Sequence, residues 1–485
     1  MPIKDQFFVS DDWNIVRFHH FLKKNFPFFW LHLPGAIANS CPSMNQSHRF
    51  KLFVMMVLEF FIWGAWLPLI FSYLPGLNFS PLQQSLILNA FPIAAIIGMF
   101  FSNQFADRYF AAEKFMAFSH LLGGLALIGL ALTKTFWPFF GLMLVYCLLY
   151  VPTLSIANQI AFAHLKDARD FGFVRMGGTL GWILAAWPFT FIFVDWGRVQ
   201  AAHPQGIVNW IGAALANGLN GPALQNATKW TYVVAGIASL VLAAFSLTLP
   251  HTPPKKAGEG GVERLAWAEA MKLLRHPFVL VLWMVTFLDA VVHNCYFNWA
   301  GSFLGASREV GGVGIPGNWI MPVMSVGQIA ELLTMFVLGA TLKRLGYRAT
   351  MILGILAYPV RFAVWAFFPH NPALIVLVQI LHGVCYAFFF AAVYIFAEEY
   401  FPKDVRASAQ GLFNVMILGI GVLVANSICP KLAQETFLRN GATDFHHLFL
   451  VPLTVALISA IALALFFRPP QTRQIEPAGR AIGTV

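Results

Sequence analysis

The sequence predicts an all-α membrane protein with twelve transmembrane helices in two six-helix halves. The chain has 485 residues, of which 58% are hydrophobic and only 11% are charged; a soluble chain carries about 25% charged residues. Its mean hydropathy is +0.68. Apolar segments of the roughly 20 residues that a helix needs to cross a bilayer recur along the chain. A polar linker divides these segments into two equal sets.

The apolar segments give the predicted spans in order. The first half, 51–250, holds spans at 52–74, 84–106, 115–133, 136–161, 173–194 and 230–250. The second half, 278–468, holds spans at 278–303, 319–342, 349–368, 372–396, 407–429 and 448–467. The linker 251–277 begins rich in Pro and Gly and continues from Val262 as a predicted amphipathic helix on the membrane surface.

Loop charges predict the orientation. With both termini in the cytoplasm, the predicted inner loops hold most of the lysines and arginines found in loops. The net charge of +10 therefore indicates positive-inside loops rather than nucleic-acid binding. We expect a multi-pass monomer in the lipid bilayer of the inner cell membrane, with residues 469–485 as a cytoplasmic tail.

The N-terminal extension, residues 1–50, fits this plan poorly. It has no small-residue cleavage site after an apolar core, so it is not a convincing signal peptide, and we expect Met44 to be the biological start. The five cysteines show no paired spacing, and four of them lie in apolar segments. We therefore predict no disulfide framework, no metal site and no cofactor.

Two loops indicate an internal repeat. The loop at 103–114 carries Arg108 and Lys114, and the loop at 339–348 carries Arg344 and Arg348. The two loops follow the second and the eighth span, so they hold matching places in the two halves. Two parallel halves related by an axis along the membrane normal are the arrangement of the major facilitator superfamily.

Several local sequences resemble the nucleoside:proton symporter family of that superfamily. They are FIWGAWLPLIFSYL (61–74), YVPTLSIANQIAFAHL (150–165), VRMGGTLGW (174–182), SVGQIAELL (325–333), LGYRATMILGILAYPVRFAVWAF (345–367) and VRASAQGLF (405–413). The resemblance covers nearly all of 51–468. It implies proton-driven uptake of nucleosides by alternating access at a central site between the halves.

Glu331 is the most exceptional residue of the eighth span. It lies deep in an apolar run, where a charge costs roughly 2.5–3.5 kcal/mol. Gln328 precedes it by one helical turn on the same face, and the resemblance assigns both to the substrate site; the alternative is a helix–helix hydrogen bond. Apolar surroundings favour a neutral carboxyl group. We expect Glu331 to take a proton from outside and release it to the cytoplasm.

Two elements of the first half are further candidates. Arg175 and Thr179 share a helical face and match the family's R…GT element, which implies substrate binding; the alternative for Arg175 is snorkelling at the inner surface. Glu59, Trp63 and Trp66 share a face of the first span. We predict that Trp63 stacks on the base and that Glu59 beside it is a candidate for proton coupling.

The seventh span supplies Asp289, His293 and Asn294. Asp289 and His293 are four residues apart, so we expect them to touch and share a proton, as candidates for coupling. Asn294 falls where the resembling family has a substrate-binding amide. Asp289 is alternatively the partner of an arginine, and Arg361 in the ninth span is expected to be structural.

The tenth span carries His382 and Tyr386 on one face. We predict that both bind substrate; the alternative is ordinary helix packing. Members of the family have an aspartate at the next position, where this chain has Ala387. If that aspartate takes part in coupling in the family, we expect Glu331 to carry the coupling alone here or to share it with Asp289 and His293; otherwise the coupling itself differs.

Other functions remain open at this stage. The same fold could carry another small polar solute, such as a sugar, or serve as a non-transporting receptor. The buried Glu331, Arg175 and Asp289 together argue against the receptor. An enzyme is not expected, because the sequence shows no nucleophile–base constellation, phosphate loop or metal-ligand spacing.

Overall fold

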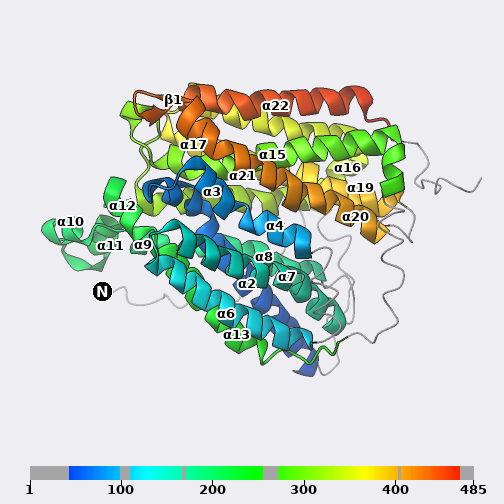
Figure 1. Cartoon of the computed structure of the whole chain (residues 1–485), viewed down its shortest axis with the longest axis horizontal. Helices are drawn as coiled ribbons and strands as arrows, with labels where there is room; N and C mark the ends of the chain where they lie inside the picture. Colours follow the sequence, from blue (N-terminus) through cyan, green and yellow to red (C-terminus); the bar gives the residue numbers. More distant parts are fainter. Residues whose placement is uncertain (1–42, 99–109, 166–170, 255–270, 402–405, 470–485) are drawn as a thin grey trace, which may run out of the picture. The chain divides into compact units, whose positions relative to one another are not determined.

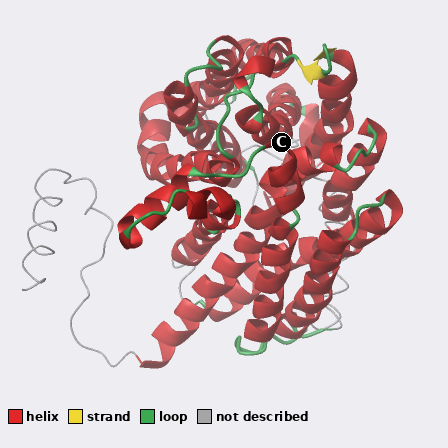
Figure 2. Ribbon diagram, turned by 90° about the vertical axis from the view of Figure 1, so that its left-hand side faces the viewer, coloured by secondary structure: helices red, strands yellow, loops and turns green. Residues whose placement is uncertain are grey.

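Helices form almost all of the computed structural model, which describes residues 43–98, 110–165, 171–254, 271–401 and 406–469. Ser47–Val485 form one compact unit by their contacts. Figure 2 shows the one strand pair of the described residues, the hairpin of β1 (Leu438–Arg439) and β2 (Ala442–Thr443). The N-terminal extension up to residue 42, most of the linker, the tail from residue 470 and the inner-loop arginine Arg108 lie outside the described residues.

Six helical segments of the first half coincide with the first six predicted spans. They are α2 (Ser43–Gly76), α3 (Pro81–Leu88) with α4 (Ala90–Ile97), α6 (Ala112–Leu132), α7 (Phe136–His164), α8 (Phe171–Ala186) with α9 (Phe189–Ile192), and α13 (Trp230–Ser246). The start of α3 has a local cause. Ser80 accepts a hydrogen bond from the backbone of Gln83, and the Gln83 side chain accepts one from the backbone of Ser80.

The second half matches the other six predicted spans. Its segments are α15 (Pro277–Gly305), α16 (Gly317–Phe367), α17 (Pro372–Val378), α18 (Ile380–Cys385), the π-helical η6 (Tyr386–Ala391), α19 (Ala392–Tyr400), α20 (Arg406–Asn414), the π-helical η7 (Val415–Ile420), α21 (Gly421–Lys431), the π-helical η8 (Leu432–Thr436) and α22 (Phe445–Phe466). Gly346 has φ 73° and ψ 171°, which breaks α16 into the predicted eighth and ninth spans.

The membrane-spanning character follows from length and composition. Within the described ranges, nine helices are long and apolar enough to cross a membrane, with the two arms of α16 counted together. The second and fifth predicted spans correspond to the shorter helices α3–α4 and α8, each of which adjoins residues outside the description. The prediction of a helical, multi-pass membrane fold is confirmed, with one short hairpin added among the described residues.

One connection differs from expectation. The link between the fifth and sixth spans contains three short helices that the sequence pattern does not predict. They are α10 (Trp196–Ala201), α11 (Gly206–Ala216) and α12 (Gly221–Ala227). The amphipathic helix predicted from Val262 falls largely on 255–270, outside the described residues. Directly before α15 the structure has a 3₁₀ turn, η4 (Leu273–Arg275).

The two halves meet along two pairs of helical segments. Segments α3 and α4 pack on α21 and η7, and α8 and α9 pack on α16. In Figure 1, α15, α16, α21 and α22 run together in the upper part, and α2, α6, α7, α8 and α13 run together below.

Polar contacts between the halves gather at one end of the molecule. Gln84 and Gln434 exchange hydrogen bonds of 2.9 and 2.7 Å between side-chain amides. The Asn89 amide donates to the Ser427 hydroxyl at 2.9 Å. On the other helix pair, the indole of Trp319 donates to the carbonyl of Leu215 at 2.8 Å. These contacts hold the halves together at the end where α2 finishes and α16 begins.

Candidate functional site

A cavity of about 480 Å³ lies between the halves, within the usual range for sites that bind small molecules. Every residue predicted to bind substrate lines it, together with His293 from the set proposed for proton coupling. These residues are Trp63, Arg175 and Thr179 from the first half, and His293, Asn294, Gln328, Glu331, His382 and Tyr386 from the second. The cavity wall therefore brings together the residues predicted to bind substrate, although they come from spans far apart in the chain.

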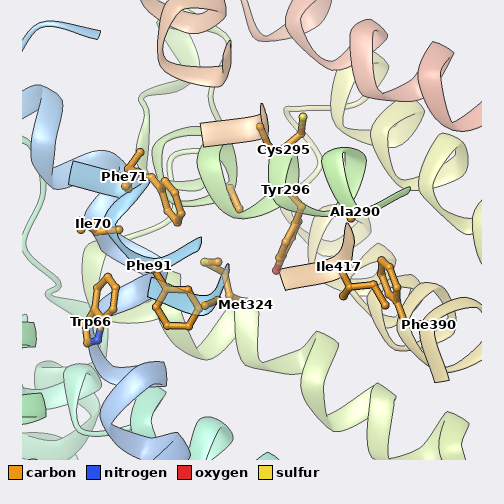
Figure 3. Close-up of a cluster of buried hydrophobic side chains, with 14 of the residues drawn as sticks. Trp66, Ile70, Phe71, Phe91, Ala290, Cys295, Tyr296, Met324, Phe390 and Ile417 are labelled. Carbon is orange, nitrogen blue, oxygen red and sulfur yellow. The ribbon is translucent and has the colours of Figure 1, made fainter. Parts of the chain in front are cut away.

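The first half supplies an aromatic wall. Trp63 stacks on Phe91 with ring centroids 4.7 Å apart and meets the edge of Trp182 at 5.2 Å. Trp66 is held differently, because its indole N–H donates to the Tyr146 hydroxyl at 3.0 Å. Trp66 and Phe91 of the first half and Phe390 of the second all line the cavity, and Figure 3 shows Phe390 on the opposite side of the picture from Trp66. A flat ligand would find apolar ring surfaces on both sides.

Arg175 and Glu331 bring opposite charges to the cavity from opposite halves. Arg175, on α8, lines the cavity and holds its guanidinium carbon 4.4 Å from the centre of the Phe60 ring. Glu331 of α16 lines the same cavity from the second half. Among the described residues, Glu331 is the one acidic side chain in the cavity wall. The arrangement can therefore hold a polar solute between a fixed cation and a carboxyl group.

Gln328 and His382 are brought together by tight packing of α16 against α18. A Cβ atom at Gly327 would lie 2.9 Å from Cβ of His382, so only glycine fits there without displacement. Nε2 of His382 lies 3.3 Å from Nε2 of Gln328, and Nδ1 of His382 lies 3.0 Å from Nη1 of Arg361. Arg361 is fully buried and rests on the ring of Tyr296 at 4.2 Å.

The predicted contact between Asp289 and His293 is wrong. Nδ1 of His293 is paired with the Tyr358 hydroxyl at 2.8 Å, and the His293 ring stacks on His382 with centroids 5.0 Å apart. Asp289 is fully buried outside the cavity wall, and neither of its carboxyl oxygens has a hydrogen-bond partner among the described residues. Helical spacing allows the contact, but the His293 ring instead pairs with Tyr358 and stacks on His382.

Glu59 also lies elsewhere than predicted. It is fully buried away from the cavity, where its carboxylate meets Nε2 of His120 at 2.8 Å and accepts a hydrogen bond from Thr153 at 2.7 Å. Ser239 completes this cluster, with its hydroxyl 3.1 Å from Nδ1 of His120. The expected carboxylate beside Trp63 is thus absent from the stacking wall, because Glu59 turns toward α6 and α7.

Several residues of the cavity wall were not singled out from the sequence. They include Asn158, Trp182, Tyr394 and Asn414. The Tyr394 hydroxyl donates to the Asn414 side-chain oxygen, which fixes two polar groups at the wall. Asn158 and Trp182 lie inside the family-like segments 150–165 and 174–182, and an asparagine within an apolar span was a usable signal.

Comparisons with known proteins agree with this geometry. A family model described as "Nucleoside H+ symporter" matches residues 44–216 and 202–472. The putative nucleoside transporter YegT of Escherichia coli K12 is 31% identical over 428 residues, which cover 86% of this chain and 93% of that protein. The nucleoside permease NupG of the same strain is 26% identical over 449 residues, covering 88% of this chain and 97% of its own length.

The fold has matching solved structures. The crystal structure of the nucleoside transporter NupG superposes with a TM-score of 0.70 at 24% identity, covering 87% of this chain and 99% of that chain. A D-xylose–proton symporter reaches 0.61 at 14% identity, covering 87% of this chain and 98% of its own, which shows the shared fold alone. The family and the relatives are transporters rather than enzymes. The chain belongs to the nucleoside:proton symporter family of the major facilitator superfamily.

Proposed function

We propose that the cavity binds one nucleoside between the two halves and that proton entry drives its uptake. The observation that carries this proposal is the pairing of an aromatic wall with a polar wall in one cavity. Trp63, on Phe91, offers a ring face for a base. Gln328 and Glu331, on the facing half, offer an amide and a carboxyl group. A nucleoside has this same division into a flat ring and a hydroxyl-rich sugar.

The polar residues take separate roles in this proposal. Asn294 donates through its side-chain nitrogen to the carbonyl of Ala290 at 2.8 Å, which leaves its oxygen to accept from the ligand. Arg175 and Thr179 supply donors from the first half. His382 and Tyr386 close the cavity from α18 and η6. A ligand that touches both halves links them, as alternating access requires.

Glu331 is the proposed proton carrier. It is the acidic side chain of the cavity wall within the described residues, and Arg175 lines the same cavity from the other half. Proton binding neutralises Glu331 and removes its attraction to Arg175. The proton and the nucleoside therefore act on the same two residues. Asp289 lies outside the wall and Glu59 is enclosed by its own partners, which makes both weaker candidates. His293, paired with Tyr358, stays a secondary one.

Orientation and assembly complete the proposal. We propose that the protein is a monomer in the inner membrane and that both of its termini lie in the cytoplasm. The contacts of Gln84 with Gln434 and of Trp319 with Leu215 then lie at the outer end. The described conformation is accordingly one in which the halves are closed toward the outside.

Glu331→Gln tests the proton role in proteoliposomes. We expect this variant to lose uptake of radiolabelled nucleoside driven by an inside-alkaline pH gradient, and to keep exchange of internal for external nucleoside at equal pH. Glutamine keeps the size and polarity of the side chain but cannot carry the proton. Glu309→Gln, in the exposed 3₁₀ turn η5 (Arg308–Val310), is the matched control and retains both activities. Gradient-driven uptake at the unmodified rate in Glu331→Gln would remove Glu331 from the role.

A further inference from the structure

Arg361 lies outside the cavity, yet it is connected to it through two side chains. Its Nη1 atom is 3.0 Å from Nδ1 of His382, and Nε2 of His382 is 3.3 Å from the side-chain nitrogen of Gln328. Arg361 is fully buried, and Gln328 and His382 are 6% and 2% exposed. Of the three, only His382 and Gln328 border the cavity. The chain of contacts therefore runs from a buried cation to the ligand space.

The first contact determines the tautomer of His382. A guanidinium group has only N–H donors and no acceptor. Nδ1 of His382, at hydrogen-bond distance from it, must therefore accept through its lone pair. A ring whose Nδ1 accepts carries its proton on Nε2. His382 is thus neutral and turns an N–H donor toward Gln328.

The second contact then determines the direction of the Gln328 amide. The Nε2–H of His382 needs an acceptor, and an amide nitrogen cannot serve as one. The Gln328 oxygen can, and it has no hydrogen-bond partner among the described residues. A half-turn of the amide exchanges the two ends with almost no change in shape, and hydrogen bonding decides between them. The favoured orientation puts the oxygen on His382 and leaves the NH₂ group for the ligand.

We propose that Arg361 is a positioning residue that, through His382, fixes the Gln328 amide with its NH₂ group toward the bound nucleoside. The inference rests on the proposed function of the cavity and deepens it. The site selects a ligand with a hydrogen-bond acceptor at that point, which a base carbonyl or an unprotonated ring nitrogen supplies. Without Arg361, His382 is free to carry its proton on Nδ1. The amide then reverses and offers an acceptor instead.

Nitrogen NMR reads the tautomer directly. Protein labelled with ¹⁵N-histidine is placed in lipid nanodiscs, and His382→Gln identifies the signals of the His382 ring by their loss. We expect a protonated Nε2 and an unprotonated, hydrogen-bonded Nδ1 in the unmodified protein and in Arg361→Lys, which keeps a donor. Arg361→Met is expected to shift the Nδ1 signal. A proton on Nδ1 in the unmodified protein overturns the proposal.

Transport kinetics of the same variants supply the second readout. We expect Arg361→Met to raise KM for the nucleoside about 2- to 12-fold, the worth of one neutral hydrogen bond, with a smaller change in kcat. Arg361→Lys should restore KM. A fall in kcat at constant KM would mark Arg361 as merely structural and overturn the proposal. Absence of nucleoside transport by the unmodified protein, with Nε2 protonated, would instead refute the proposed function and leave the tautomer assignment supported.

Discussion

Nε2 of His120 lies 2.8 Å from a carboxylate oxygen of Glu59, and both side chains are withdrawn from solvent. The second carboxylate oxygen accepts from Thr153 at 2.7 Å, and Ser239 holds the other ring nitrogen at 3.1 Å. The cluster joins α2, α6, α7 and α13 inside the first half. A carboxylate so enclosed is suited to fixing helices together rather than to exchanging protons with a cavity.

Loss of His120 should therefore weaken the fold. His120→Ala leaves the buried Glu59 without its ring partner, which costs about 3–5 kcal/mol of unfolding free energy when one member of a buried pair is removed. We expect a clear drop in the thermal unfolding midpoint of His120→Ala in detergent. Glu59→Gln, which can still hydrogen-bond to both partners, should keep most of the stability and the gradient-driven uptake. Loss of that uptake in a stable Glu59→Gln would make Glu59 the proton carrier.

The contacts between Gln84 and Gln434 should have to break in every transport cycle. Their side-chain amides lie 2.9 and 2.7 Å apart, on opposite halves. We expect Gln84→Cys combined with Gln434→Cys to lose nucleoside uptake after treatment with a short bis-methanethiosulfonate, which joins the two thiols through disulfides, and to regain it after reduction. Each single variant, treated alike, controls for the buried native cysteines. Full uptake with the bridge in place would refute alternating access by separation at this end.

Asp444 should make stability depend on acid pH. Partial burial raises the pKa of Asp444, but the backbone N–H of His447, the His447 ring at 2.8 Å and Arg439 at 3.1 Å outweigh it, and the pKa lies below its ordinary value. The stabilisation is therefore present above the unfolded pKa of about 3.9 and is lost as pH falls through the lower folded value.

Asp444→Asn removes the charge but keeps a side-chain oxygen that can cap the start of α22, as Asp444 does. We expect its unfolding midpoint to lie below that of the unmodified protein at neutral pH, by the equivalent of about 1 kcal/mol or less. The difference should shrink as the pH falls through the lowered pKa of Asp444, because aspartic acid and asparagine are both neutral below it. A difference that stays constant across this range would show that the charge contributes nothing.

The spans and much of the cavity wall could be predicted from the sequence because a bilayer restricts the structures that a spanning chain can adopt. A polar side chain in an apolar span is expensive, so Glu331, Gln328 and Arg175 were conspicuous where they stood. Helical spacing then identified which of them share a face. These two rules need no knowledge of how helices pack.

Contacts between helices could not be predicted in the same way. Glu59 shares a face with Trp63 by spacing, yet its partner His120 comes from a helix whose rotation only packing determines. Asp289 and His293 are one turn apart, but Tyr358 from the ninth span takes the histidine. The small helices α10–α12 were missed because their apolar residues are too few in a row to mark a span.

The central claim is that this protein moves nucleosides together with protons, and uptake by the purified protein tests it most directly. Proteoliposomes are given radiolabelled uridine or adenosine, with and without an imposed inside-alkaline pH gradient. We expect accumulation of nucleoside that exceeds the external concentration only when the gradient is present, with no competition from excess sugar. Uptake that ignores the gradient would contradict the coupling, and no uptake of either nucleoside would contradict the assignment of the cavity.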